Sequence, residues 1–213
     1  MDACKLIAIT VSTNYSDLLP YVIESNIKYF DKWIFITSKD DIDTISQLSN
    51  NDKIQILTYD FQNSDKIFDK GGAILNAQDY VYEKYPDHWY LLIDSDICLS
   101  NNFLNFLLEV DNSIEENTLY GASNRLNFAT LQDFKNKENY IDYNKSGTSM
   151  IDGYFQLYKS KFYYSKSMDA SECDWTFNHS FGNKKHLNSF TCYHLGKNGN
   201  WKGRIIGSDF IIN

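Results

Sequence analysis

The stretch that decides the fold is Trp89-Tyr90-Leu91-Leu92-Ile93-Asp94-Ser95-Asp96-Ile97-Cys98-Leu99, an apolar run interrupted by two carboxylates. A continuous run of apolar and aromatic residues is typical of a strand buried on both faces, as the central strands of parallel sheets are. An ionised carboxylate is costly to bury without a partner. The strand is therefore expected to end at Asp94 and to present both acids to water, a metal ion or a ligand.

The spacing of the two acids favours a metal site. Side chains alternate along an extended chain, so Asp94 and Asp96 are expected to point the same way while Ser95 points away. Two hard oxygen donors that converge on one point suit Mg²⁺ or Mn²⁺, especially where phosphates complete the coordination shell. The alternative is a loop in which Asp-Ser-Asp only caps a turn.

Length and composition indicate one folded domain. The chain has 213 residues, of which 43% are hydrophobic and 23% charged, and its mean hydropathy is -0.45. No apolar run approaches the roughly 20 residues that a transmembrane helix needs. The N-terminal residues run directly into a predicted strand and lack the basic region and cleavage site of a secretory signal. We therefore expect a cytoplasmic protein without a transmembrane segment.

Charge and cysteine content argue against a nucleic-acid-binding protein and against a disulfide-rich protein. A formal net charge of -8 argues against a nucleic-acid partner, because neutralising phosphates requires clustered Lys and Arg. A small ligand that carries phosphate remains compatible, since a bound divalent cation can offset its charge. The four cysteines are widely spaced and form no C-x-x-C pair, which favours buried free thiols over a disulfide framework.

Strand and helix patterns alternate along the first hundred residues. Apolar runs predict strands at residues 5–11, 33–37 and 53–59, and helical spacing predicts helices at residues 18–29, 42–48 and 73–84. A strand, a helix and a strand of these lengths form a βαβ unit with parallel pairing. Ligands of such sheets bind beyond the carboxyl ends of the strands. The loops at residues 10–17 and 37–41 are therefore expected to line the same rim as Asp94 and Asp96.

The second half is expected to complete the same domain. The pattern predicts helices at residues 103–108 and 175–181 and strands at residues 119–123, 150–158 and 190–195. The polar residues 124–147 are interpreted as a surface excursion or a mobile lid, and a Gly-rich basic tail follows at residues 196–204. The predicted fold is a single α/β domain over residues 1–213, with a mixed, mostly parallel sheet flanked by helices.

A possible anion site precedes the helix at residues 73–84. Gly71 and Gly72 would leave backbone N–H groups free to meet an anion, and Lys70 would add a mobile positive charge. The alternative is an ordinary helix start with a flexible approach.

At this point the order of motifs resembles the nucleotide-sugar-dependent glycosyltransferases of the GT-A fold. Residues Lys70-Gly71-Gly72-Ala73-Ile74-Leu75-Asn76 are similar to a K-G-x-A-x-N element, and the strand at residues 89–93 ends in D-x-D. The segment from His194 to Arg204 resembles the H-x-x-G…K-P-W element of the retaining family 8 enzymes, with a longer spacing and no proline. Small enzymes of this kind also occur in large DNA viruses that glycosylate their capsid protein, which would place the chain in the host cytoplasm.

The resemblance implies roles for the polar residues on the donor side. Asp94 and Asp96 would hold Mn²⁺ or Mg²⁺, with His194 as a further ligand. The residues expected to contact the nucleotide and its phosphates are Thr10, Asn14, Tyr15, Asp40, Lys70, Asn76, Ser95, Lys197, Lys202 and Arg204. The basic tail is expected to be mobile and to close over the diphosphate. A satisfied core or rim histidine and a solvated cationic tail remain the alternatives.

Four polar residues fall on the acceptor side, namely Asp152, Gln156, Glu172 and Asp174. An inverting enzyme needs one carboxylate to deprotonate the acceptor hydroxyl, and Asp174 is the first candidate, with Glu172 second. In a retaining enzyme the same acid would orient hydroxyls of the donor, and the family 8 likeness of the tail favours retention.

The activity that the resemblance implies is transfer of a hexose from a nucleotide sugar, most readily a UDP-sugar, to a hydroxyl of a glycan or glycoprotein. Residues 1–100 would bind the nucleotide and residues 101–213 the acceptor. One alternative is a sugar-nucleotide-forming nucleotidyltransferase, although no glycine-rich basic signature follows the first strand. Another is a haloacid-dehalogenase-type phosphatase, whose D-x-D normally opens its domain. The non-enzymatic alternative is a sugar- or calcium-binding module.

Overall fold

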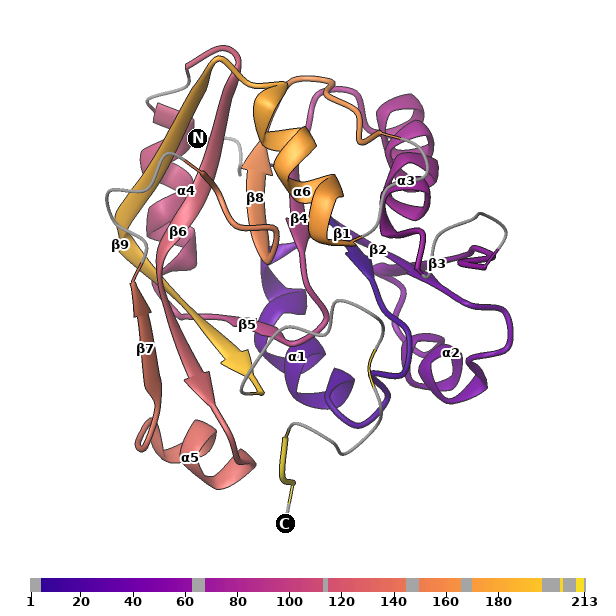
Figure 1. Cartoon of the computed structure of the whole chain (residues 1–213), viewed down its shortest axis with the longest axis vertical. Coiled ribbons are helices and arrows are strands. Elements are labelled where there is room, and N and C mark those ends of the chain that lie inside the picture. The colour runs from indigo at the N-terminus through magenta and orange to yellow at the C-terminus, as the bar shows by residue number, and fades with distance from the viewer. Residues whose placement is uncertain are drawn as a thin grey trace.

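The computed structural model describes residues 5–62, 68–112, 115–144, 150–165, 170–196, 204 and 210–212. These residues form a single α/β domain around a nine-stranded sheet of strand order β3-β2-β1-β4-β8-β6-β9-β5, with β7 paired to β6 (Figure 1). The elements are β1 (Leu6–Val11), α1 (Leu19–Asn26), β2 (Lys32–Thr37), α2 (Ile42–Leu48), β3 (Ile54–Thr58), α3 (Lys70–Lys84), β4 (Trp89–Ile93), β5 (Ile97–Leu99), α4 (Phe103–Asn112), β6 (Thr118–Phe128), α5 (Leu131–Asn136), β7 (Ile141–Asn144), β8 (Phe155–Tyr158), α6 (Ala170–His179) and β9 (Asn183–Leu195).

The first half of the sheet is parallel, as predicted. Strand β1 lies between β2 and β4 and pairs in parallel with both, and β3 continues the same direction at the edge. The carboxyl ends of β1 and β4 therefore open on the same rim, and Asp94 follows the last residue of β4 directly. This part of the prediction is confirmed.

Helices cover both faces of the sheet because the central strands are apolar on both sides. Along β1, Leu6 and Ala8 pack into a core that includes residues of α1 and α4, whereas Ile7 and Ile9 pack into a second core with α3 and α6. Strand β4 alternates in the same way. Figure 1 shows α3 and α6 together on one side of the sheet, where they contact each other.

The second half of the sheet is mixed. Strand β8 pairs antiparallel with both β4 and β6, and β9 runs parallel to β6 and antiparallel to β5. The sequence pattern gives no signal for β5 and places the start of β9 at Phe190 instead of Asn183. It also starts β8 too early, because residues 150–154 precede the strand.

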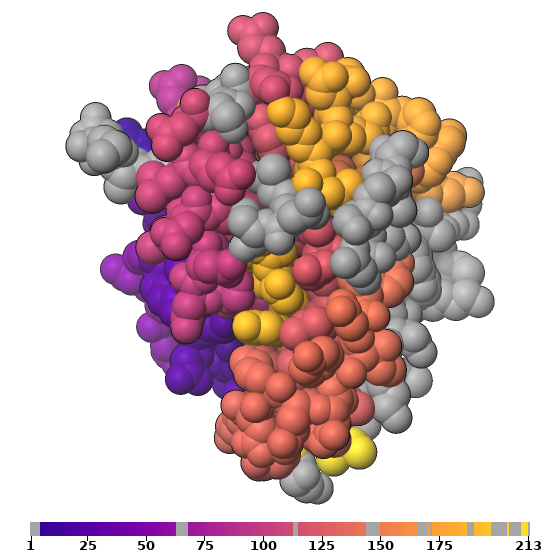
Figure 2. Space-filling view, turned by 90° about the vertical axis from the view of Figure 1, so that its left-hand side faces the viewer, coloured from indigo at the N-terminus to yellow at the C-terminus, as the bar shows by residue number. Residues whose placement is uncertain are grey.

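The polar segment at residues 124–147 is not an unstructured excursion in its described part. Strand β6 continues to Phe128 because its pairing with β9 extends to Phe128 and Leu195. Thr130 then caps α5 by accepting a hydrogen bond from the Asp133 backbone N–H, and β7 turns back along β6. In the space-filling view of Figure 2, this segment (salmon) and α4 (magenta) lie on either side of a visible strip of β9.

Candidate functional site

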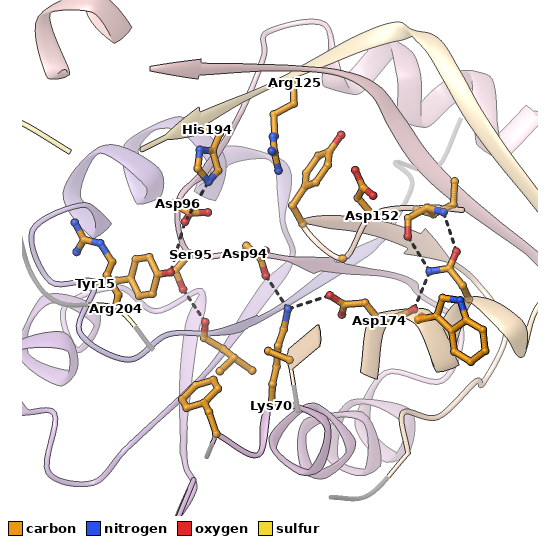
Figure 3. Close-up of a pocket in the computed structure, with 18 of the residues that line it drawn as sticks. Tyr15, Lys70, Asp94, Ser95, Asp96, Arg125, Asp152, Asp174, His194 and Arg204 are labelled. Atoms are coloured by element: carbon orange, nitrogen blue, oxygen red, sulfur yellow. Dashed lines mark hydrogen bonds and ion pairs between the residues drawn. The ribbon is translucent and has the colours of Figure 1, made fainter. Parts of the chain in front are cut away.

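A cavity of about 350 Å³ opens beyond the carboxyl ends of β1 and β4. Its walls come from seven parts of the chain: the loop after β1, the start of α3, the turn after β4, the β6–β8 region, α6, the end of β9 and Arg204. Figure 3 shows the side chains that converge on it, among them Lys70, Asp94, Asp96, Asp174 and His194. A volume of this size is sufficient for a small organic ligand.

Asp94, Ser95 and Asp96 form a turn between β4 and β5 and do not continue the strand. All three residues line the cavity. The Ser95 hydroxyl donates to the Val11 carbonyl at 2.7 Å, which fixes the turn against the end of β1. The expectation that Asp94 and Asp96 point the same way assumed an extended chain, and the turn removes that basis. Asp94 contacts Lys70 from α3, whereas Asp96 contacts His194 from β9.

Asp96 and His194 form a buried pair. His194 Nε2 lies 3.5 Å from Asp96 Oδ2, and the side chains are 3% and 5% exposed. His194 Nδ1 donates to the Gly196 carbonyl at 2.9 Å, so that its Nε2 faces the carboxylate. Burial disfavours charge on both groups, but their mutual attraction outweighs it, which lowers the pKa of Asp96 and raises the pKa of His194.

Lys70 connects Asp94 to Asp174, a residue of α6. Its ammonium lies 3.2 Å from Asp94 Oδ1 and 3.6 Å from Asp174 Oδ2. Burial alone would lower the pKa of Lys70, but the charges of Asp174 and Asp94 hold it well above the ordinary value. Burial raises the pKa of Asp94 to about 6 against the opposing effect of Lys70. Lys70 is therefore a charged and fixed group, not the mobile one expected.

Of the two N–H groups expected to meet an anion, that of Gly72 is already bonded within the chain. Helix α3 begins at Lys70, three residues before the predicted start, with Asp69 as its N-cap. The Asp69 carboxylate accepts a hydrogen bond from Gly72 N at 2.9 Å. The backbone N–H of Gly72 is therefore already bonded to a carboxylate of the chain and is not free to bind a ligand anion.

Asp174 is held from three sides. Besides its ion pair with Lys70, its Oδ1 lies 3.0 Å from the Tyr164 hydroxyl, which is also 2.5 Å from Gln156 Oε1. Burial and the neighbouring Asp174 charge keep the pKa of Tyr164 well above its ordinary value, so this hydroxyl remains a donor. Gly153 lies directly against the carboxylate, where a Cβ atom would come within 1.8 Å of Asp174 Oδ2.

A divalent cation fits the Asp96 side of this cavity. Asp96 Oδ1 is buried and has no hydrogen-bond partner among the described residues, and such an orphaned carboxylate oxygen is a natural metal ligand. His194 Nε2 and the Asp94 carboxylate are the further donors nearby. Within the described ranges, no group of three or more His, Cys, Asp or Glu side chains is already arranged as a metal site. Ligand binding would have to complete the coordination.

Arg204 also reaches the cavity wall, but as a structural ion pair. Its side chain is fully buried, and Nη2 donates to Asp17 Oδ2 at 2.9 Å while Nη1 donates to the Asn14 carbonyl at 3.0 Å. The guanidinium lies 5.1 Å from the ring centre of Tyr15. The expectation that Arg204 is mobile is therefore wrong. Lys197 and Lys202 lie outside the described residues, as does most of the expected lid.

The remaining predicted residues divide into three groups: those that line the cavity, those buried within the fold, and those exposed elsewhere. Tyr15 and Asp152 line the cavity. The Thr10 hydroxyl is satisfied within the sheet by Ile93 and Trp33, and Gln156 is buried behind Asp174. The structure places four further residues outside the cavity lining, all of them exposed: Asn14, Asp40, Asn76 and Glu172. Asp41, the neighbour of Asp40, instead caps α2 and accepts from Asn14 N.

Sequence reasoning did not identify several residues that line the cavity: Arg125, Tyr143, Tyr154, Trp175 and Asn178. Arg125 and Tyr143 belong to the segment interpreted as a polar excursion. The alternation of apolar and polar residues in Arg125-Leu126-Asn127-Phe128 is a strand signal that could have extended the predicted strand and placed Arg125 on one of its faces.

Comparisons with known proteins bear on the fold. No family model matches the chain, and no curated protein matches its sequence. None of the helices within the described residues has the length and apolar character to span a bilayer. The structure is similar to that of a protein assigned as a glucose-1-phosphate thymidylyltransferase from Bacillus anthracis, crystallised with sucrose, with a TM-score of 0.51, 13% identity and 88% of each chain covered.

Two weaker similarities involve 4-diphosphocytidyl-2C-methyl-D-erythritol synthases. One gives a TM-score of 0.49 with 13% identity over 87% of this chain and 89% of the other. The second, from Anaerococcus prevotii, gives a TM-score of 0.44 with 13% identity over 91% and 90%. At these identities the similarity establishes the fold alone, and these two scores are too low to carry an argument.

These findings correct the expected activity. The motif resemblance predicted a glycosyltransferase, whereas the Bacillus anthracis structure with the similar fold is assigned as a thymidylyltransferase. The hexosyltransferase prediction is therefore wrong, and the findings favour its stated alternative, a sugar-nucleotide-forming nucleotidyltransferase.

Proposed function

We propose that the chain is a metal-dependent nucleotidyltransferase that joins the nucleotidyl group of a nucleoside triphosphate to a sugar phosphate. The observation that carries the proposal is the cavity at the carboxyl ends of β1 and β4, where Asp94 lies beside the fixed Lys70 ammonium and Asp96 beside His194. This is the place where open α/β sheets bind nucleotides. The fold shared with a thymidylyltransferase-like structure supports the same reaction class.

The nucleotide is assigned to the part formed by residues 1–100. Tyr15 and Ser95 line this side of the cavity, and the loop after β1 is held by Arg204. The sequence lacks a glycine-rich basic signature after the first strand. Arg204, from the far end of the chain, brings a positive charge to that loop, although Asp17 offsets it. The second substrate is assigned to the part formed by residues 101–213, which contributes Asp152 and Asp174.

The reaction needs positioning and charge compensation more than proton transfer. An oxygen of the sugar phosphate attacks the α-phosphorus of the triphosphate, a new P–O bond forms, and the bond to the β-phosphate oxygen breaks to release pyrophosphate. A phosphate monoester is largely dianionic at neutral pH, so the attacking oxygen carries no proton that must be removed. Asp174 is therefore assigned to positioning Lys70 and the sugar hydroxyls, instead of acting as a base.

Charge compensation is assigned to the acids and to Lys70. Asp94, Asp96 and His194 would hold Mn²⁺ or Mg²⁺, which when bound would neutralise charge that develops on the phosphates. Lys70 remains protonated because its acidic neighbours hold its pKa high, and its ammonium is directed at the same part of the cavity.

The test is release of pyrophosphate. Purified protein with Mn²⁺ and glucose 1-phosphate is offered ATP, CTP, GTP, UTP and dTTP in turn. Pyrophosphate and a nucleoside diphosphate sugar should form in equal amounts with at least one triphosphate. Release of a nucleoside diphosphate from a ready-made nucleotide sugar, without pyrophosphate formation in any combination, would overturn the proposal.

Asp94→Asn and Asp96→Asn should each abolish this turnover, since each removes a metal ligand. Asp94→Asn should leave the protein folded, because burial disfavours the Asp94 charge more than Lys70 favours it. Asp96→Asn loses the favourable pair with His194 and should lower the free energy of unfolding without unfolding the protein. Calorimetric titration with Mn²⁺ and the preferred triphosphate measures the loss of binding. Asp79→Asn, on the exposed side of α3, is the matched control. Unchanged metal binding in both variants would remove these residues from the metal site.

A further inference from the structure

Arg125 occupies a distinctive position in the cavity wall. It lies on β6 and its guanidinium carbon is 4.5 Å from the ring centre of Tyr143 on β7 and 4.6 Å from that of Tyr154. All three residues line the cavity. Figure 3 shows the guanidinium pointing into the space between His194 and Asp152. Contacts with two aromatic rings stabilise the cation and limit its movement.

Arg125 forms no ion pair with any described residue, although its charge acts on Asp96 and His194 from a distance. The other basic side chains of the cavity wall each face an acidic partner: Lys70 faces Asp94, His194 faces Asp96, and Arg204 faces Asp17. Among the described residues that line the cavity, Arg125 is the only cation without an ion pair. Its Nε atom is buried and lacks a hydrogen-bond partner within the described chain. A buried guanidinium N–H without a partner is uncommon and favours an anionic ligand.

The strand register places Arg125 next to His194, which faces Asp96. On the paired strands β6 and β9, Arg125 is opposite Cys192 and Asn127 is opposite His194. Arg125 and His194 are therefore diagonal neighbours, two positions apart along the strands. A ligand phosphate at Arg125 would thus lie close to the site assigned to the metal, on the side of the second substrate.

We propose that Arg125, held by Tyr143 and Tyr154, binds the phosphate of the second substrate and makes the enzyme specific for a phosphomonoester over the unphosphorylated sugar. The inference rests on the proposed function and specifies its substrate class. The two rings hold the guanidinium in place. Its N–H donors, which form a planar fork, can then bind two oxygens of one phosphate. Asp152 on the same wall would repel a phosphate, and the Arg125 charge offsets that repulsion.

The experiment compares wild-type protein with Arg125→Gln, Arg125→Lys and Lys159→Gln. Lys159 is the matched control because it also lies over an aromatic ring, that of Trp89, but outside the cavity wall. With Mn²⁺ and saturating triphosphate, Arg125→Gln should raise KM for glucose 1-phosphate about 10- to 100-fold. KM for the triphosphate should change less than about threefold. Arg125→Lys should be intermediate, since it keeps the charge and loses the fork.

Direct binding separates this inference from the proposed function. Wild-type protein without nucleotide or metal is titrated with inorganic phosphate, glucose 1-phosphate and glucose. Phosphate and glucose 1-phosphate should bind and glucose should not, and Arg125→Gln should abolish that binding while its thermal unfolding stays cooperative. Phosphate binding that depends on Arg125 supports the inference even if no triphosphate turns over. Binding and KM values that are the same in Arg125→Gln as in wild type would overturn it.

Discussion

The position of Asp174 depends on the absence of a side chain at residue 153. A Cβ atom at Gly153 would come within 1.8 Å of Asp174 Oδ2 and 2.1 Å of its Cγ. No contact this short is sterically possible, so any larger residue at 153 must displace the carboxylate. Displacement would break its ion pair with Lys70 and its contact with Tyr164.

Gly153→Ala should therefore reduce the rate of pyrophosphate release about 10- to 100-fold, because misplacing a positioning group by about 1 Å has effects of this size. The free energy of unfolding should fall by about 1–3 kcal/mol from overpacking. Gly182→Ala is the control, since its Cβ would meet only the movable amide end of Asn117. Equal rates in wild type and Gly153→Ala would mean that Asp174 does not position Lys70 for the reaction.

Single residues differ in how far the sequence predicts them. Asp94 and Asp96 could be placed because they interrupt an apolar run, which is a local signal. The pairing of Lys70 with Asp94 and Asp174 could not, because it joins residues that lie far apart in sequence. Arg125 lacked any local signal of function, since its role depends on two tyrosines brought to it by the sheet.

At the scale of elements, the start of α3 determines where Lys70 lies. Asp69 caps the helix through Gly72 N, and the Tyr59 hydroxyl donates to the second oxygen of the same carboxylate at 2.7 Å. Asp69 is buried. The loop after β3 thus fixes the first turn of α3 and with it the Lys70 backbone.

Tyr59→Phe should lower the free energy of unfolding by about 1.5–3 kcal/mol, the usual contribution of a hydrogen bond to a charged acceptor. Burial, followed by the hydrogen bond to Asp69, raises the pKa of Tyr59 to about 12, while the unfolded phenol titrates near pH 10. The stabilisation is therefore fully present below about pH 10 and is lost as the pH rises through about 12.

The difference in Tm between Tyr59→Phe and wild type should accordingly be constant from neutral pH to about pH 9.5 and narrow above it. Thermal unfolding followed by circular dichroism across this range measures the difference. Tyr80→Phe is the control, as Tyr80 contacts Lys84 on the outer surface of α3. A difference in Tm that widens above pH 10 would contradict the assigned direction of the Tyr59 pKa shift.

Elements with local periodicity were predictable, whereas those created by long-range pairing were not. The helices at residues 42–48 and 73–84 and the parallel strands of the first half follow from apolar spacing. Strands β5 and β7 and the first half of β9 are polar or short, and they are strands because β6 and β9 pair over most of their length. Such pairing depends on partners distant in sequence.

At the scale of the whole molecule, four phenylalanines connect α4 to the sheet. Phe190 on β9 is fully buried, and its ring centre lies 5.3 Å from Phe103, 4.9 Å from Phe106 and 5.3 Å from Phe155. The cluster is a part of the larger core and links α4, β8 and β9.

Phe190→Ala should cost about 3–5 kcal/mol of unfolding free energy, because it removes buried apolar area and leaves a cavity. Phe190→Leu should cost less, since most of the volume is retained. Leu104→Ala, on the exposed side of α4, should change stability by less than about 0.5 kcal/mol. Urea unfolding followed by fluorescence and circular dichroism tests all three. If Phe190→Ala lowers the free energy of unfolding no more than Leu104→Ala does, the phenylalanine cluster does not contribute to the stability of the core.

The place of β9 in the strand order affects how the protein is made on the ribosome. Strand β9 leaves the ribosome after every other strand of the described chain, yet it lies between β6 and β5 and carries His194. Until translation reaches it, β6 exposes an unpaired strand edge, the kind of surface that recruits other chains. A nascent chain that stalls before residue 183 would therefore be inactive and prone to aggregation. In this fold, the sheet and the site are therefore completed at the same late stage of synthesis, when β9 emerges.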